Sequence, residues 1–155
     1  MIEDQVAPKR CGHVAGKSIV SFDDAVQRIQ AACDARDEYE AQYGPGTGPL
    51  ILARTDAVAV PGEDGGFEAA IKRCQAFRDV GCDMTFLEAP ESLEHMHEYC
   101  RRVEGPKLAN MLEQGGTSPF FFFETRKKYN RHPTEAHPAH LTCALFLFDT
   151  MLYPI

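Results

Sequence analysis

The sequence predicts an α/β protein built around a parallel β-sheet. Short apolar runs alternate with amphipathic helical patterns over the first 111 residues. The connections between the apolar runs are long enough to hold helices, as parallel strands require. No glycine-rich phosphate-binding fingerprint follows the first expected strand, which argues against a dinucleotide-binding fold. At this point a barrel and an open doubly wound sheet both fit the alternation.

The first two strands and the helix between them are expected at the start of the chain. The strand Met1–Gln5 leads into a predicted helix over about residues 22–41. Ser21 suits the N-cap of this helix, and apolar residues follow at helical spacing as far as Cys33. A loop rich in Gly and Pro comes next, and then the apolar run Leu50–Ala53. A continuous apolar run is typical of a parallel strand covered on both faces.

Two further helix–strand units complete the regular part of the pattern. Apolar residues at helical spacing over 67–77 predict a second helix, which Gly81 ends. The run Met84–Leu87 is the third expected strand. Ser92 is expected to cap a third helix, and Lys107–Met111 is expected to be the fourth strand. The crossovers in such a series should be right-handed.

Charge and apolar patterning limit the classes of function. With 16 Lys and Arg and 23 Asp and Glu residues, the 155-residue chain has a formal net charge of −7, which argues against nucleic acid as the main partner. The longest apolar stretch, Leu141–Phe148, is too short to span a bilayer, so no membrane partner is expected. The acidic start Met1–Asp4 lacks the apolar core of a signal peptide. We therefore expect an intracellular protein, cytoplasmic or mitochondrial.

Six cysteines occur without a Cys-x-x-Cys pair or a zinc-binding spacing. Cys33, Cys74 and Cys100 fall on the apolar stripes of expected helices, where a free cysteine packs as a small apolar residue. Cys11 differs, because a lysine, an arginine and a histidine all lie within two residues of it. Cationic neighbours lower the pKa of a thiol, so Cys11 is a candidate for proton transfer near neutral pH.

Polar side chains stand at the carboxyl end of each expected strand, directly after or at the end of an apolar run. They are Glu3, Arg54, Glu88 and Asn110. The carboxyl ends of parallel strands meet at one edge of the sheet, where α/β enzymes hold their active sites. Arg54 presents a fixed fork of donors that suits a carboxylate, and Asn110 offers both a donor and an acceptor. Glu3 and Glu88 are oxygen ligands suited to Mg²⁺, which together with an arginine would stabilise an enolate.

Five segments resemble, in order, the motifs of the isocitrate lyase and phosphoenolpyruvate mutase superfamily. They are Ile2–Gln5, Pro8–His13 together with Gly16 and Lys17, Ala53–Ala57, Phe86–Pro90 and Leu108–Met111. The most specific is the Lys-Arg-Cys-Gly-His loop at residues 9–13, which resembles the C–C bond-cleaving, methylisocitrate lyase-like branch. Phosphonate mutases carry a different loop, so phosphomutase chemistry of the phosphonate or carboxyphosphonoenolpyruvate type is the less favoured alternative.

The resemblance covers residues 1–119 and implies a partial (β/α)8 TIM-type barrel, about strands 4–7 of the family barrel. Residues 120–147 do not resemble the family, whereas Asp149–Ile155 faintly resembles a later barrel strand. We expect residues 120–155 to form an atypical tail, for which an insert followed by a late barrel strand is one explanation. A complete barrel needs about 250 residues. We therefore expect a truncated barrel with weak or no activity of its own, whose full-length relatives are homo-oligomers.

The resemblance also implies a reaction. The expected activity is Mg²⁺-dependent cleavage of a C–C bond in a 2-hydroxy or 2-oxo di- or tricarboxylate of the methylisocitrate, isocitrate or oxaloacetate type. A base would remove a hydroxyl proton, the C–C bond would break, and Cys11 would protonate the enolate-like product. A non-catalytic fragment that still binds carboxylates through Arg54 and Asn110 is the alternative from a different class.

Site residues carried over from the resemblance fall into three groups. The expected catalytic residues are Cys11, His13, Arg54 and Glu88. The expected substrate-binding residues are Gly12, His13, Arg54, Asn110 and Thr117. Glu3 would hold the metal through a water molecule. The other metal ligands of the family stand on strands that precede the one carrying Glu3, so we expect them to be missing from this chain.

Overall fold

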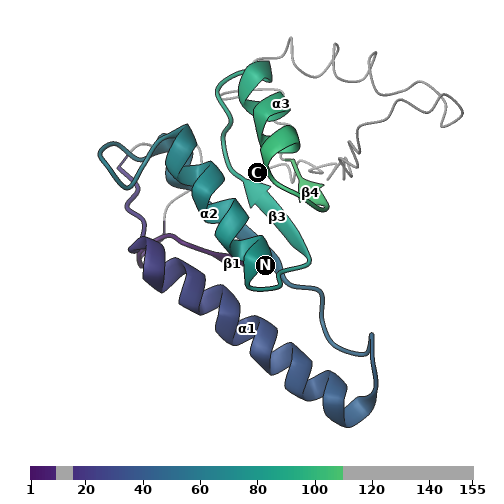
Figure 1. Ribbon diagram of the computed structural model, residues 1–155. Helices are drawn as coiled ribbons and strands as arrows, with labels where there is room; N and C mark the ends of the chain where they lie inside the picture. Colours follow the sequence, from purple (N-terminus) through teal and green to yellow (C-terminus); the bar gives the residue numbers. More distant parts are fainter. Residues whose placement is uncertain (10–15, 110–155) are drawn as a thin grey trace, which may run out of the picture.

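The computed structural model describes residues 1–9 and 16–109 (Figure 1). Within these residues, a parallel sheet is formed by β1 (Ile2–Glu3), β2 (Leu52–Thr55), β3 (Met84–Leu87) and β4 (Lys107–Leu108). The connections contain α1 (Phe22–Tyr43), the short 3-10 helix η1 (Ala57–Ala59), α2 (Phe67–Asp79) and α3 (Leu93–Arg102). In this part of the chain, no helix combines the length and the apolar character needed to cross a membrane.

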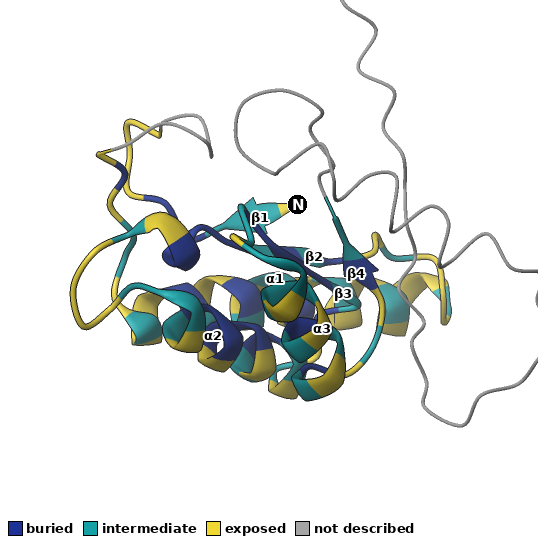
Figure 2. Ribbon diagram, turned by 90° about the horizontal axis from the view of Figure 1, so that it is seen from above, coloured by how far each residue is buried: buried dark blue, intermediate teal, exposed yellow. Residues whose placement is uncertain are grey.

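The order of the strands distinguishes a barrel from a doubly wound sheet. Each strand pairs with the next one along the chain, in the order β1-β2-β3-β4. Helices α1, α2 and α3 all lie on one face of this sheet (Figure 2). A doubly wound sheet would reverse its strand order and carry helices on both faces. The sheet therefore has the topology of a barrel segment, which agrees with the predicted α/β class.

Both predicted N-caps are confirmed. The Ser21 hydroxyl accepts the backbone N–H of Asp24 at 3.1 Å, and the Ser92 hydroxyl accepts that of His95 at 3.1 Å. Each bond satisfies one of the backbone donors left open at the start of a helix. Helix α1 runs two residues beyond its predicted end and stops at Gly44, whose φ of +106° is costly for residues with a side chain.

Strand β2 is displaced by two residues from its predicted position. The apolar pattern predicted Leu50–Ala53, whereas β2 continues to Thr55, which pairs with Leu87 of β3. Leu50 itself is 73% exposed. Backbone pairing with β1 and β3 determines where β2 begins and ends. The strand therefore includes the polar residues Arg54 and Thr55, whereas the apolar Leu50 lies outside it. Strand β3 has the predicted bounds.

The two outer strands are shorter than predicted. Strand β1 covers only Ile2–Glu3 of the expected Met1–Gln5, although Gln5 forms an isolated antiparallel bridge with Ile19. Strand β4 contains Lys107–Leu108, and the last two residues of its predicted range lie outside the described residues. The regular ladder is therefore longest at the centre of the sheet, between β2 and β3.

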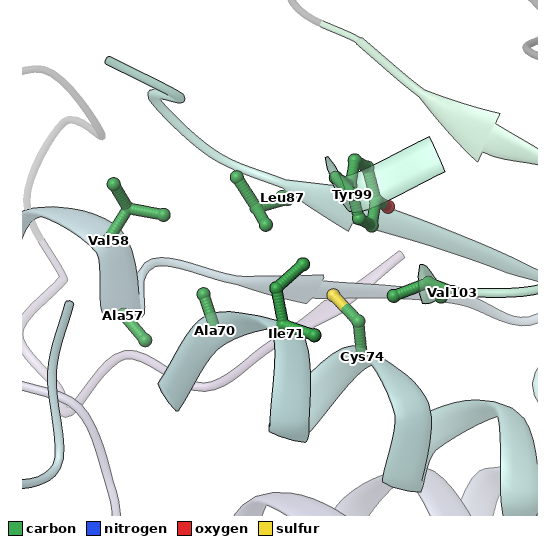
Figure 3. Packing of buried hydrophobic residues seen from close by; sticks show 8 residues of the cluster. All are labelled: Ala57, Val58, Ala70, Ile71, Cys74, Leu87, Tyr99 and Val103. Atoms are coloured by element: carbon green, nitrogen blue, oxygen red, sulfur yellow. The ribbon is translucent and has the colours of Figure 1, made fainter. Parts of the chain in front are cut away.

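Two buried apolar clusters fill the space between the sheet and its helices. The first, shown in Figure 3, contains Ala57, Val58, Ala70, Ile71, Cys74, Leu87, Tyr99 and Val103. The second contains Ala25, Ile29, Cys33, Ile51, Ala53, Phe77 and Cys82. Helix α2 contributes residues to both clusters. It is thus the helix that joins the two halves of the core.

The cysteine predictions are confirmed at two of three positions. Cys33 and Cys74 are buried, but Cys100 is only partly buried, because Tyr99 occupies the core-facing position of α3. Cys82 is also buried, and burial raises its pKa to about 11. Burial likewise raises the pKa of Cys74. These thiols are therefore protonated at neutral pH and serve as packing groups.

A buried hydroxyl pair gives a first testable prediction. The hydroxyl oxygens of Tyr99 and Thr85 lie 2.6 Å apart, and burial raises the pKa of Tyr99. Replacing Tyr99 with Phe keeps the ring but removes this partner of Thr85. We expect the free energy of unfolding, measured in urea, to fall by about 1–2 kcal/mol. Tyr39→Phe, at a half-exposed position on α1, is the matched control, and an equal loss in both variants would contradict the prediction.

Candidate functional site

Three of the predicted site residues meet at the carboxyl edge of the sheet. Arg54 lies between Glu3 and Glu88: its Nε is 3.6 Å from a Glu3 carboxylate oxygen, and its Nη1 is 3.5 Å from a Glu88 oxygen. The strand register explains this, because Glu3 is aligned with Arg54 on neighbouring strands and therefore shares its face of the sheet. The side chains of Glu3, Arg54 and Glu88 therefore lie together at the carboxyl edge of the sheet, as the sequence predicts.

Arg54 is held most tightly by Asp56, two residues further along the chain. Its Nε and Nη2 donate to the two carboxylate oxygens of Asp56, both at 2.8 Å. This bidentate pair fixes the plane of the guanidinium group, which also lies 5.1 Å above the Phe86 ring. The Nη1 side remains directed toward Glu88. Arg54 can therefore offer the N–H groups of Nη1 to a ligand without losing its main anchor.

Asp56 in turn lies between two cations. The Lys17 Nζ is 3.2 Å from the same Asp56 oxygen that accepts Arg54 Nη2, and both the Lys17 and Asp56 side chains are almost fully buried. Burial alone would raise the pKa of Asp56, but Arg54 and Lys17 lower it below its usual value of 3.8. Asp56 is thus an ionised carboxylate at neutral pH.

The charge of Arg54 is similarly secured by its neighbours. Burial alone would lower the pKa of Arg54, but Asp56, Glu88 and Glu3 together raise it. Among the described residues, the ion pairs of the site join four carboxylates to four cations: Glu3, Asp4, Asp56 and Glu88 with Lys9, Lys17, Arg54 and Arg73. A ligand carboxylate at Arg54 would therefore replace its contacts with Glu3 or Glu88, not fill an uncompensated positive pocket.

A second network lies behind the sheet edge and is centred on Asp4. The Thr55 hydroxyl donates to one Asp4 oxygen at 2.6 Å, and the Asp56 backbone N–H donates to the other at 2.9 Å. Arg73, from the middle of α2, reaches the same carboxylate at 3.3 Å and also donates to the Val20 carbonyl at 2.9 Å. Burial raises the pKa of Asp4, and these donors offset the rise only in part. Asp4 thus fixes the backbone that presents Asp56 to Arg54.

Four residues of this site were not assigned a role from the sequence. They are Asp4, Lys17, Asp56 and Arg73. One signal was available for Arg73: it lies three residues after Ala70 and four before Phe77, so a charged side chain stands on the buried face of α2. A charged residue on a core-facing stripe needs a buried partner, which here is Asp4.

Several predicted site residues lie outside the described part of the chain. These are Cys11, Gly12, His13, Asn110 and Thr117. The tail predicted at residues 120–155 also lies outside it. Their proposed roles therefore remain predictions.

Glu3 is the residue expected to contribute to a magnesium site. Residues 1–9 and 16–109 bring together no group of three His, Cys, Asp or Glu side chains that could hold a metal ion. Glu3 instead lies 3.1 Å from Lys9 Nζ and 3.6 Å from Arg54 Nε. Mg²⁺ prefers six oxygen ligands, and two nearby cations oppose its binding. The described residues alone therefore do not fit a magnesium ion.

Asp56 should make stability depend on pH. Because its folded-state pKa lies below 3.8, the unfolded state takes up a proton first as the pH falls, and the contribution of Asp56 to stability is lost at acid pH. In Asp56→Asn, unfolding free energy should therefore decline less steeply between about pH 5 and pH 3. Denaturant unfolding across this range measures the slope. Asp64→Asn, in an exposed loop, is the control; a slope in Asp56→Asn equal to that of the unsubstituted protein would refute the prediction.

Comparison with known proteins agrees with this fold. Residues 1–121 match the phosphoenolpyruvate phosphomutase family, and the chain belongs to that family. Over 116 residues it is 47% identical to 2-methylisocitrate lyase of Aeropyrum pernix, covering 75% of this chain and 33% of that protein. The predicted superfamily is thereby confirmed.

Two solved structures extend the comparison to the fold. The crystal structure of 2,3-dimethylmalate lyase, a PEP mutase/isocitrate lyase superfamily member, matches with a TM-score of 0.65 and 41% identity over 76% of this chain and 36% of that chain. Oxaloacetate acetylhydrolase with the inhibitor 3,3-difluorooxalacetate matches with a TM-score of 0.65 and 34% identity over the same shares. The fold is thus part of a TIM barrel, and the chain spans about a third of the length of the relatives it matches.

Proposed function

We propose that this chain carries part of the active site of a C–C lyase that acts on a 2-hydroxy or 2-oxo di- or tricarboxylate. The observation that carries the proposal is Arg54, a partly buried cation at the carboxyl edge of the sheet whose plane Asp56 fixes. A fixed guanidinium is suited to a carboxylate. The names of the relatives support the same class: 2-methylisocitrate lyase and 2,3-dimethylmalate lyase.

For a 2-hydroxy acid, the proposed reaction begins with removal of the hydroxyl proton by a base. The oxygen electron pair then forms a carbonyl, and the bond to the neighbouring carbon breaks. That carbon keeps the bonding pair as an enolate beside a carboxylate, and Cys11 supplies the proton that converts it to a C–H bond. Arg54 would hold the carboxylate through Nη1, where developing negative charge is stabilised by a donor that is already in place.

The remaining residues are assigned by position and by family likeness. Glu88 lies directly beside Arg54 Nη1 and would therefore be next to the bound carboxylate. The residues proposed to complete the substrate site are Gly12, His13, Asn110 and Thr117. Mg²⁺ is the proposed metal, with Glu3 holding it through water. Its other ligands would come from outside the described residues, and none of the steps above is derived through it.

A product assay tests the proposal. Purified chain is incubated with Mg²⁺ and, in turn, 2-methylisocitrate, 2,3-dimethylmalate and oxaloacetate, and products are followed by proton NMR. We expect slow cleavage at most, because the described residues alone do not form a magnesium site. Cys11→Ser should abolish it, whereas Cys100→Ser, at a partly buried helical position, should not. A Cys11→Ser variant that is as active as the unsubstituted chain would refute the lyase proposal.

A metal-independent carboxylate-binding module is the second candidate. It is favoured by the geometry of the described residues. Asp56 already orients Arg54 through two hydrogen bonds, whereas no three metal-ligating side chains of the described residues lie close enough together to hold an ion. Calorimetric titration with oxalate, with and without Mg²⁺, separates the two candidates. Binding that needs Mg²⁺ supports the lyase, and equal binding under both conditions, lost in Arg54→Ala, supports the module.

A further inference from the structure

Arg54 and Lys17 share one carboxylate oxygen. Asp56 Oδ1 accepts Arg54 Nη2 at 2.8 Å and Lys17 Nζ at 3.2 Å, while its other oxygen accepts Arg54 Nε. The Lys17 side chain is 1% exposed and that of Asp56 is fully buried. Lys17 lies 39 residues away along the chain, so the fold brings it to Asp56. Burying a charged lysine side chain costs free energy, so the burial of Lys17 indicates that its contact with Asp56 has a role.

The electrostatic effect of Lys17 follows from this sharing. Asp56 alone would cancel most of the positive charge of Arg54 as a ligand experiences it. Lys17 offsets the charge of Asp56 from the other side, and solvent screens this pair little because both side chains are buried. In the described part of the chain, the charge of Arg54 is then opposed mainly by Glu3 and Glu88, whose contacts a ligand would replace.

The geometric effect reinforces the electrostatic one. A carboxylate held by a single arginine can turn about its own side-chain bonds together with that arginine. Here Lys17 holds Oδ1 from a different segment of the chain, and the Asp56 backbone is tied to Asp4. Arg54 is therefore paired with a carboxylate whose position is determined on two sides. This is the arrangement that a preorganised binding group needs.

We propose that Lys17 is a positioning residue that acts through Asp56 to orient Arg54 and to keep its charge available to an anionic ligand. The ligand part of this statement rests on the proposed function, in which that ligand is a carboxylate. The orientation of Arg54 does not rest on it. Lys9 has a similar distance to its own partner, 3.1 Å to Glu3, but its side chain is 71% exposed and is not expected to share this role.

Nitrogen NMR and calorimetry on the purified chain test the proposal. In the unsubstituted protein, the Arg54 Nε–H signal should be visible and slow to exchange, because it is bonded to Asp56. Lys17→Met should shift and broaden this signal and weaken oxalate binding about tenfold. Lys17→Arg, which keeps the charge, should restore both measurements in large part. Lys72→Met, at an exposed position on α2, should change neither.

Each outcome decides a separate claim. An Arg54 signal that is identical in Lys17→Met and in the unsubstituted protein overturns the Lys17 proposal, whether or not oxalate binds. Absence of oxalate binding in the unsubstituted protein counts against the proposed function, and the Arg54 signal still decides the role of Lys17. Should Lys17→Met fail to fold, exchange of the Lys17 ammonium protons in the unsubstituted protein replaces it. Exchange slower than at Lys72 supports the proposal, and equally fast exchange overturns it.

Discussion

Replacing Arg54 with lysine should weaken oxalate binding by about 100-fold. Lysine keeps the positive charge but cannot make the two parallel bonds that Arg54 makes to Asp56. The shorter ammonium group would also no longer present a second donor side toward Glu88. Calorimetric titration of the folded variant measures the loss directly.

The matched control is Arg101→Lys. Arg101 also forms a two-bond pair with a carboxylate, that of Glu98, but it lies exposed on α3 and away from the sheet edge. Its replacement should leave oxalate affinity unchanged. Circular dichroism shows whether each variant remains folded. An Arg54→Lys variant that is folded and binds oxalate within about twofold of the unsubstituted protein would refute the assigned role of Arg54.

Replacing Arg73 with methionine should lower the free energy of unfolding by about 3–5 kcal/mol. Arg73 and Asp4 are both about 1% exposed and lie 3.3 Å apart, so the substitution leaves a buried carboxyl group without its cation. It also removes the donor to the Val20 carbonyl, which ties α2 to the segment before α1. Urea unfolding followed by circular dichroism gives the free energy.

Two further variants show whether the loss comes from the ion pair. Lys72→Met, the preceding residue on the same helix, removes an exposed charge and its contact with the Phe22 ring, and should cost less than about 1 kcal/mol. The double variant Arg73→Met with Asp4→Asn should lose less stability than the two single losses added together, because both remove the same interaction. Strict additivity, or a loss in Arg73→Met no larger than in Lys72→Met, would contradict a stabilising pair.

Local patterns predicted the elements because the determinants of those elements are local. Apolar spacing located α1, α2 and β3, and the two serine caps were predicted from single residues whose hydroxyls accept a backbone N–H three positions later. The same locality explains the error at β2. Its end depends on pairing with β3, and that information lies about 30 residues further along the chain.

The site was only half predictable for a related reason. Glu3, Arg54 and Glu88 follow from the rule that parallel strands end at one edge. The groups that orient Arg54 come from elsewhere: Lys17 from the segment before α1 and, through Asp4, Arg73 from α2. The Arg73–Asp4 contact joins residues 69 positions apart, and no periodicity connects them. Sequence patterns thus identify the groups that face a ligand better than the groups that hold them in place.

The lyase proposal is tested most directly by cleavage of 2-methylisocitrate in heavy water, followed by mass spectrometry. Breaking the bond beside the hydroxyl-bearing carbon must yield a 2-oxo acid and a dicarboxylate in equal amounts. Because the enolate is protonated by an exchangeable group, the dicarboxylate should carry one carbon-bound deuterium, and Cys11→Ser should form neither product. A dicarboxylate without solvent deuterium, or a Cys11→Ser variant that forms as much product as the unsubstituted chain, would contradict the proposed reaction.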